Sequence, residues 1–220
     1  RPSVWTMYRA GLARALDRVA TESGLRRDWE AACRGETGID AFDAWARELV
    51  ETGYLHNHAR MWVASIWIFT LRLPWELGAD FFLRHLLDGD PASNTLSWRW
   101  VAGLQTKGKS YLARPDNIAK YTGGRFRPEG LAASAPPLDG PEHPPLGPAP
   151  VSDPIDPAAP TGLLLTEEDL APGFLFESGV TPRATAFLNC TAGLSPLAVA
   201  PHVGAHVEGA MQDIAARWSG

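Results

Sequence analysis

The sequence predicts a mainly helical domain, followed by a proline-rich linker and a small segment of mixed strands and helices. Apolar residues recur at helical spacing through residues 5–102, and no strand pattern interrupts them. Residues 131–160 are dominated by alanine, proline and glycine, a composition typical of a linker or an irregular covering segment. The order strand, cap, strand, helix in residues 161–220 is typical of an α/β layer. We therefore expect a helical domain over residues 1–130, a linker and an α/β-like segment.

The bulk composition is that of a soluble globular protein, with 45% hydrophobic and 20% charged residues among 220. Cys33 and Cys190 have no metal or redox spacing and are expected to be reduced thiols in a cytoplasmic protein. The most apolar run, residues 61–70, is too short to span a bilayer, so no membrane association is expected. The chain does not begin with methionine, and we expect it to be a fragment that is incomplete at its N-terminus.

The net charge of −5 is unevenly distributed along the chain. Residues 1–130 carry 18 Lys and Arg against 15 Asp and Glu, a net charge of +3, whereas residues 131–220 carry 2 against 10, a net charge of −8. Any binding to a polyanion is therefore expected in the first part. Its basic residues are interleaved with aromatic ones over residues 103–130, which are expected to be loop-like.

The first half of the helical domain divides into three predicted helices. Helical spacing of apolar residues predicts one helix over residues 5–20 and a shorter one over residues 25–34. Asp40 is expected to be the N-cap of a third helix that runs to residue 51, because a short acidic side chain accepts hydrogen bonds from free backbone N–H groups. Gly53 is expected to end that helix.

The second half contains a long apolar helix, predicted over residues 56–73 and halted by a proline, and another over residues 75–87. Asp90 followed by Pro91 is the pattern of an N-cap with proline at the first helical position. A helix is therefore expected to begin there and to run to about residue 102.

Two strand candidates define the C-terminal segment. They are residues 162–165 and residues 183–189, both apolar and bounded by turn residues. The sequence Thr-Glu-Glu-Asp at residues 166–169 resembles a capping box, and residues 201–218 have the spacing of a closing helix.

The chemically richest stretch is DGDPASNTLSWRW at residues 88–100. Asp90, Asn94 and Trp98 recur at intervals of four, so a helix places a carboxylate, an amide and an indole on one face. A carboxylate accepts a hydrogen bond from a ring N–H, an amide donates or accepts, and an indole can exchange an electron. This face suits an aromatic ligand with polar edges.

A second stretch, TGYLHNHARM at residues 52–61, supplies Asn57 and Arg60. We expect Arg60 to pair with Asp88, since two acids in a buried pocket would otherwise be difficult to keep ionised. A purely structural role, in which Asp90 caps a helix and the tryptophans pack, is the alternative for residues 88–100 alone.

Metal sites are not supported by the sequence. A calcium loop starting at Asp88 would place an alanine, a serine and an arginine at its fifth, sixth and twelfth positions. His202 and His206 have the spacing of zinc ligands, but Val203 stands where a zinc protease has its glutamate. We therefore expect no metal site.

Together with GETGIDAFDAWAREL at residues 35–49, the two stretches resemble the C-terminal FAD-binding half of DNA photolyases and cryptochromes. The resemblance covers about residues 30–127 and keeps the internal spacing of that family. It implies a helical FAD-binding domain of photolyase type, with FAD as cofactor. The family's antenna domain and its upstream phosphate-binding segment are not found in these residues, which predicts a truncated or reduced relative.

The resemblance implies a role for each matching residue. Asn57 contacts the phosphate region of the cofactor, Arg60 lies beside the flavin ring, Asp90 accepts from the ring imide N–H, and Asn94 faces flavin N5. The implied cofactor-binding residues are Tyr54, Asn57, Arg60, Asp88, Asp90, Ser93 and Asn94.

A chain of tryptophans that photoreduces the flavin is also implied. Trp98 matches its first member and Trp75 its second. The third falls at Glu22, which cannot serve as an electron donor, so Trp5 and Trp29 are the candidates to replace it.

The function that the resemblance implies is light-driven repair of pyrimidine dimers in damaged DNA. Met61 and Trp100 match residues that line the lesion pocket, and a flipped-out base needs such an aromatic, apolar pocket at the base of a basic rim. The alternatives are a cryptochrome-like flavoprotein that senses blue light or redox state without repair, and a structural remnant without flavin.

Overall fold

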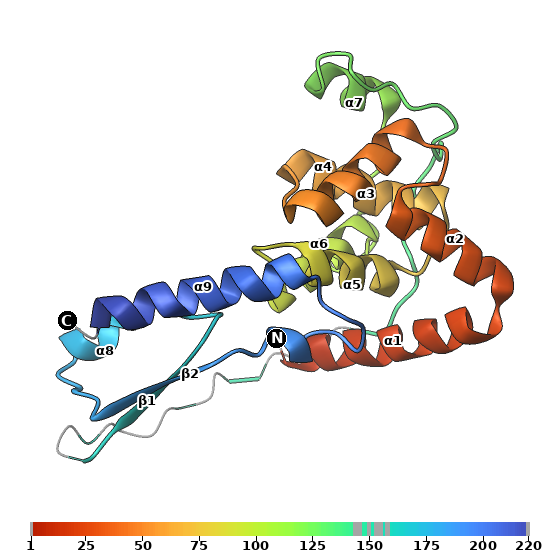
Figure 1. The fold of residues 1–220 in the computed structure, drawn as a ribbon. Helices are drawn as coiled ribbons and strands as arrows, with labels where there is room; N and C mark the ends of the chain where they lie inside the picture. Colours follow the sequence, from red (N-terminus) through yellow and green to blue (C-terminus); the bar gives the residue numbers. More distant parts are fainter. Residues whose placement is uncertain (1, 143–146, 149–150, 152–155, 157–158, 219–220) are drawn as a thin grey trace. The chain divides into compact units, whose positions relative to one another are not determined.

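The computed structural model describes residues 2–142, 147–148, 151, 156 and 159–218. They form two compact units, Arg1–Pro144 and Pro145–Gly220, and each is described by itself. The first unit is built from helices, and the second contains two short strands and two helices longer than one turn (Figure 1). The predicted mainly helical fold is confirmed. Among the described residues, no helix has the length and apolar character needed to cross a membrane.

The first three helices are α1 (Pro2–Thr21), α2 (Ser23–Arg34) and α3 (Asp40–Thr52). Helix α1 packs against α2 and also against the later helices α5 and α6, whereas α2 packs against α3. Gly53 ends α3 in a left-handed conformation with φ of 70°, as the sequence predicts.

The predicted capping role of Asp40 is wrong. Ile39 occupies the N-cap position, and Asp40 is the first residue of α3. Asp43, one turn into the helix, instead ties down the preceding loop: its carboxylate accepts from the backbone N–H groups of Thr37 and Gly38 and from the Thr37 hydroxyl, at 2.7–2.9 Å. The loop and the acid are five and six residues apart in sequence, so this contact is local.

The long apolar helix is divided in the structure. Helix α4 (Asn57–Ser65) continues directly into a π-helical turn, η1 (Ile66–Thr70), in which Leu71 N donates to Ile66 O at 2.9 Å. Arg72 then adopts a left-handed conformation with φ of 56°. The helix therefore ends before residue 73, and the wider π turn occurs in a buried section.

Helices α5 (Trp75–His85) and α6 (Pro91–Val101) follow, and they pack against each other. The predicted N-cap is confirmed, because the Asp90 carboxylate accepts from Ser93 N at 2.6 Å. A further helix, α7 (Pro115–Tyr121), lies within the stretch that was predicted to be loop-like. Its sequence signal was a proline at the first helical position.

Residues 131–142 form an irregular segment that covers the helical unit. Leu131, Ala132 and Ala135 pack against its core, and Leu138 N donates to Ala102 O at 2.9 Å. A covering role for this stretch is what its alanine- and proline-rich composition predicted, whereas part of residues 143–158 lies outside the described residues.

The second unit contains strands β1 (Gly162–Thr166) and β2 (Ala184–Leu188), with the short helix α8 (Gly173–Glu177) between them. The strands pair in parallel, with Gly162 opposite Ala184. The 3-10 turn η2 (Thr191–Gly193) and helix α9 (Pro201–Trp218) complete the unit.

The predicted capping box at residues 166–169 is wrong, because a turn rather than a helix follows β1. The Glu167 carboxylate instead accepts from Cys190 N at 2.9 Å and from the Thr191 hydroxyl at 2.7 Å. These bonds join the chain after β1 to the chain after β2.

Candidate functional site

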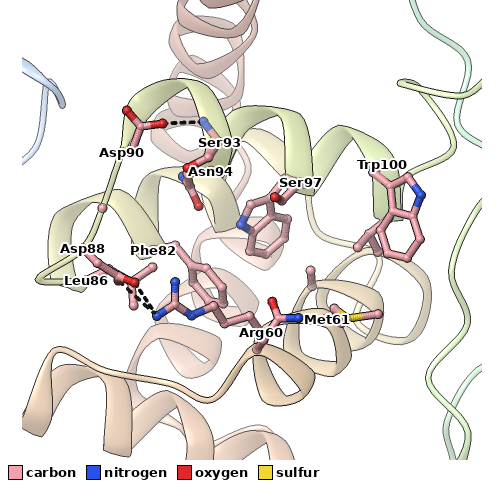
Figure 2. Close-up of a pocket in the computed structure, with 15 residues that line it drawn as sticks. Arg60, Met61, Phe82, Leu86, Asp88, Asp90, Ser93, Asn94, Ser97 and Trp100 are labelled. Atoms are coloured by element: carbon pink, nitrogen blue, oxygen red, sulfur yellow. Dashed lines mark hydrogen bonds and ion pairs between the residues drawn. The ribbon is translucent and has the colours of Figure 1, made fainter. Parts of the chain in front are cut away.

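A cavity of about 400 Å³ opens in the first unit, with walls from α4, α5, the turn after α5, and α6 (Figure 2). Its volume is in the usual range of small-molecule and cofactor sites, about 300–1,000 Å³. Nine of the residues singled out in the sequence line it: Asn57, Arg60, Met61, Asp88, Asp90, Ser93, Asn94, Trp98 and Trp100.

The amino-terminal end of α6 forms one rim of the cavity. Asp90, Asn94 and Trp98 line the same space, as their spacing predicts. The Asp90 carboxylate is exposed and already caps Ser93 N, which leaves its remaining lone pairs for a ligand N–H. Figure 2 shows Asp90 and Trp100 at opposite ends of α6.

Asn94 is buried and has a fixed orientation. Its Nδ2 donates to the backbone oxygen of Ala79 in α5 at 2.8 Å. A backbone carbonyl can only accept, so the NH₂ end of the amide must point toward α5. No described residue donates to Oδ1 of Asn94, and this oxygen is therefore available as an acceptor for a ligand.

Arg60 and Asp88 form the pair that the sequence predicts. Arg60 Nη2 lies 3.0 Å from both carboxylate oxygens of Asp88, and Arg60 Nε donates to Leu55 O at 2.8 Å (Figure 2). The expected reason for the pairing is wrong. The Asp88 side chain is 62% exposed, so burial does not destabilise its charged form. The pair instead fixes the position of the Arg60 guanidinium at the cavity wall.

Trp98 lies at the bottom of the cavity and is 2% exposed. Its ring meets Phe82 edge to face at 5.1 Å and Trp67 at 6.1 Å between centroids. Its indole Nε1 is buried without a hydrogen-bond partner among the described residues. Such an orphan donor is costly unless it faces a ligand or serves a function.

Trp100 stands at the open end of the cavity, where its ring stacks on Tyr111 with centroids 5.6 Å apart. Burial raises the pKa of the Tyr111 phenol, so this residue remains neutral throughout the physiological range. Together with Met61, these rings give the entrance an aromatic and apolar character.

Two of the predicted residues lie outside the cavity lining. Tyr54 is 55% exposed, and its ring lies under the Arg60 guanidinium at 5.9 Å. Trp75 lies on α5 and lines a second cavity of about 680 Å³.

The sequence reasoning missed the apolar part of the lining. Six further residues complete it: Ala64, Phe82, Leu86, Gly89, Ser97 and Val101. Phe82 and Leu86 carried a signal, since they lie four apart, with Phe82 on α5 and Leu86 as its C-cap residue. Their pattern is the same as that of ordinary core residues, so it did not identify a site. Within the described part of the chain, no cluster of three or more metal-binding side chains occurs.

Comparison with known proteins gives the same picture. Residues 4–130 match the family model for the FAD binding domain of DNA photolyase. The chain belongs to this family. The chain is 35% identical to deoxyribodipyrimidine photo-lyase of Streptomyces griseus over 144 residues, which are 60% of this chain and 30% of the relative.

Other relatives share shorter stretches with this photolyase-family chain. Deoxyribodipyrimidine photo-lyase of Agrobacterium fabrum is 44% identical over 35% of the chain and 16% of the relative. Cryptochrome-1 of Arabidopsis thaliana is 37% identical over 44% of the chain and 14% of the relative. The chain thus spans less than a third of the length of these relatives. No solved structure matches it significantly.

FAD is the cofactor of this domain family, and the cavity residues fit part of it. The unpaired Oδ1 of Asn94 and the exposed carboxylate of Asp90 are acceptors, as the N–H groups of a flavin ring require. The Arg60 guanidinium and the amino-terminal end of α6 suit the electron-rich carbonyl edge of the ring.

Proposed function

We propose that the first unit binds the flavin ring of FAD in the cavity between α4, α5 and α6, and that it supports light-driven repair of pyrimidine dimers in DNA. The observation that carries the proposal is the fixed orientation of Asn94, whose free amide oxygen faces a cavity of suitable size. The deoxyribodipyrimidine photo-lyase relatives support the repair reaction.

The chain's own residues would position the cofactor. Asp90 would accept from the imide N–H of the ring, Asn94 would accept from the N–H that N5 carries when the ring is reduced, and Arg60, held by Asp88, would lie alongside. Asn57, at the start of α4, lines the cavity and would contact the phosphate region of the cofactor. When bound, FAD supplies a light-absorbing ring system that exchanges single electrons.

Substrate would enter at the other end of the cavity. Met61 and Trp100 provide an apolar and aromatic wall for a flipped-out dimer, and Trp100 stacked on Tyr111 is a rigid platform. The basic side chains of residues 107–127 would contact DNA phosphates. Trp98, buried beneath the ring, would donate the electron that reduces the flavin before repair.

A cryptochrome-like sensor is the second candidate, and the identity to Cryptochrome-1 favours it. Both candidates need bound flavin, so the first test is the absorption spectrum of the purified protein. Flavin bands in the near-UV and blue are expected. A colourless protein that does not take up added FAD would refute both and leave a structural role for the acid–arginine pair.

Repair and sensing are separated by a second test. The reduced, flavin-loaded protein is illuminated with an oligonucleotide that contains a cyclobutane dimer, and dimer content is measured by chromatography. Repair predicts loss of the dimer only in the light. Unchanged dimer content with intact flavin photochemistry would leave the sensor.

Substitutions at Asp90 separate its capping role from its proposed ligand role. Asp90→Asn keeps the cap, because Asn is as good an N-cap as Asp, and the free energy of unfolding should be unchanged. Flavin affinity should fall about tenfold, since a neutral hydrogen bond replaces a charge-assisted one. Asp90→Ala should lose the cap as well, at a cost of about 0.5–2 kcal/mol. Urea unfolding and flavin titration check both, and wild-type affinity in Asp90→Asn would remove Asp90 from the site.

A further inference from the structure

A line of aromatic rings leads from α5 across α1 to the surface of the helical unit. The ring of Trp75 contacts Tyr8 with centroids 5.8 Å apart, and Tyr8 contacts Trp5 at 5.0 Å. Trp75 and Tyr8 are buried, whereas Trp5 is partly exposed. These contacts hold where α1 packs against α5.

The inner end of this line reaches the floor of the cavity. The ring edge of Trp98 contacts Gly78 of α5. A Cβ added at Gly78 would lie 2.3 Å from Trp98 Cη2. Gly78 is one helical turn beyond Trp75, on the same side of α5. Trp67, which contacts Trp98, donates its Nε1 proton to Pro74 O at 3.0 Å, next to Trp75.

We propose that Trp5 is the terminal electron donor of this chain, and that Tyr8 is the bridge that connects it to Trp75. The inference rests on the proposed function, because it needs a photoexcited flavin that takes an electron from Trp98. It supplies the surface donor that Glu22, at the expected third tryptophan position, cannot be.

Tyr8 acts as a bridge rather than as a radical site. Its side chain is 1% exposed, and its hydroxyl has no hydrogen-bond partner among the described residues. Burial raises the pKa of the Tyr8 phenol far above its usual range, and Asp80 and Glu76 add to this effect against Arg9 and Arg84. A phenol loses its proton when it is oxidised, and no group in the described part of the chain accepts a hydrogen bond from this hydroxyl. The electron therefore passes through the ring without leaving a hole on it.

Trp5 is suited to end the path. One electron moves from Trp5 to the oxidised Trp75, and the indole N–H of Trp5 then releases its proton to water, which leaves a neutral radical. The Arg9 guanidinium lies 5.9 Å from the ring and disfavours a positive charge there, so it promotes this proton loss. A thiol in solution returns one electron, and water returns the proton.

Other aromatic side chains are less suited to carry the electron to the surface. Trp67 continues to Phe42 and Phe81, whose phenyl rings are much harder to oxidise than indole. Within the described structure, the ring of Trp29 on α2 makes no ring contact with Trp75 or Tyr8.

The test uses the flavin-loaded full chain under pulsed blue light. Trp5→Phe should shorten the lifetime of the tryptophan radical, followed by transient absorption and electron paramagnetic resonance, by about tenfold or more, an effect of about 1.4 kcal/mol on a barrier. Tyr8→Phe keeps the bridging ring and should behave like wild type, whereas Tyr8→Leu should resemble Trp5→Phe. Trp29→Phe is the matched control and should change nothing.

Two results would overturn the inference: a wild-type radical lifetime in Trp5→Phe, or equal effects of Tyr8→Phe and Tyr8→Leu. Flavin absorbance and circular dichroism verify that each variant is loaded and folded. Failure of the proposed function can be distinguished from failure of this inference. In that case the protein would contain no flavin, or the flavin would still be photoreduced in Trp98→Phe. If Trp98→Phe blocks photoreduction while Trp5→Phe does not, only the exit through Tyr8 and Trp5 is wrong.

Discussion

Replacing Trp98 with phenylalanine is expected to block photoreduction of the flavin while the flavin stays bound. A phenyl ring is much harder to oxidise than an indole, so the rate should fall by at least about tenfold, equal to about 1.4 kcal/mol or more in activation free energy. The side chain lies at the bottom of the cavity, against Phe82 and Trp67, where no other cavity-lining indole is buried. Steady illumination with an external thiol, followed by flavin absorbance, measures the rate.

The fold should tolerate this change. Truncation of a buried aromatic residue to alanine costs about 3–5 kcal/mol, but phenylalanine retains most of the apolar contacts of Trp98. It also removes a buried N–H that has no partner in the described structure.

Trp100→Phe is the matched control, because Trp100 lies on the same helix at the open end of the cavity. It should keep normal photoreduction and impair dimer repair, and normal photoreduction in Trp98→Phe would refute the electron path.

Local sequence signals predicted the parts of the site that depend on one helix. Asp90 and Pro91 determine the start of α6, and the interval of four then places Asn94 and Trp98 on the cavity side. The Arg60–Asp88 pair was predicted from the charges of two separate stretches, although the two residues lie 28 positions apart. Interactions within a few residues of sequence are sufficient for the start of α6 and for the placement of Asn94 and Trp98 on it.

Features that depend on tertiary packing were not predictable in the same way. The exposure of Asp88 depends on how the turn after α5 faces solvent. The π-helical turn lies where α4 enters the core, and periodicity alone does not distinguish it from an α-helix. The contacts of Tyr8 with Trp5 and Trp75 require α1 and α5 to be adjacent, and no local sequence pattern predicts this.

Gly78→Ala is expected to destabilise the helical unit, although alanine is the better helix former by about 1 kcal/mol. The added Cβ would lie 2.3 and 2.5 Å from two ring carbons of Trp98 and 3.0 Å from Trp67. Trp98 cannot retreat, because Phe82 and Trp67 pack edge to face against it. Overpacking of this kind costs about 1–3 kcal/mol, so after the gain in helix propensity we expect a net loss of up to about 2 kcal/mol in urea unfolding.

The cause of this loss can be isolated with a double-mutant cycle. Phenylalanine at position 98 lacks the outer ring carbons that meet the added methyl group, so Gly78→Ala should become neutral or stabilising in the Trp98→Phe background. Gly24→Ala serves as a control within α2, where an added Cβ meets nothing within 4 Å and the change should be neutral or slightly stabilising. If the effects at positions 78 and 98 are additive, the close approach of Trp98 to α5 is not the reason why position 78 needs glycine. Strong coupling would establish the contact between Trp98 on the cavity floor and α5, the helix that carries Trp75.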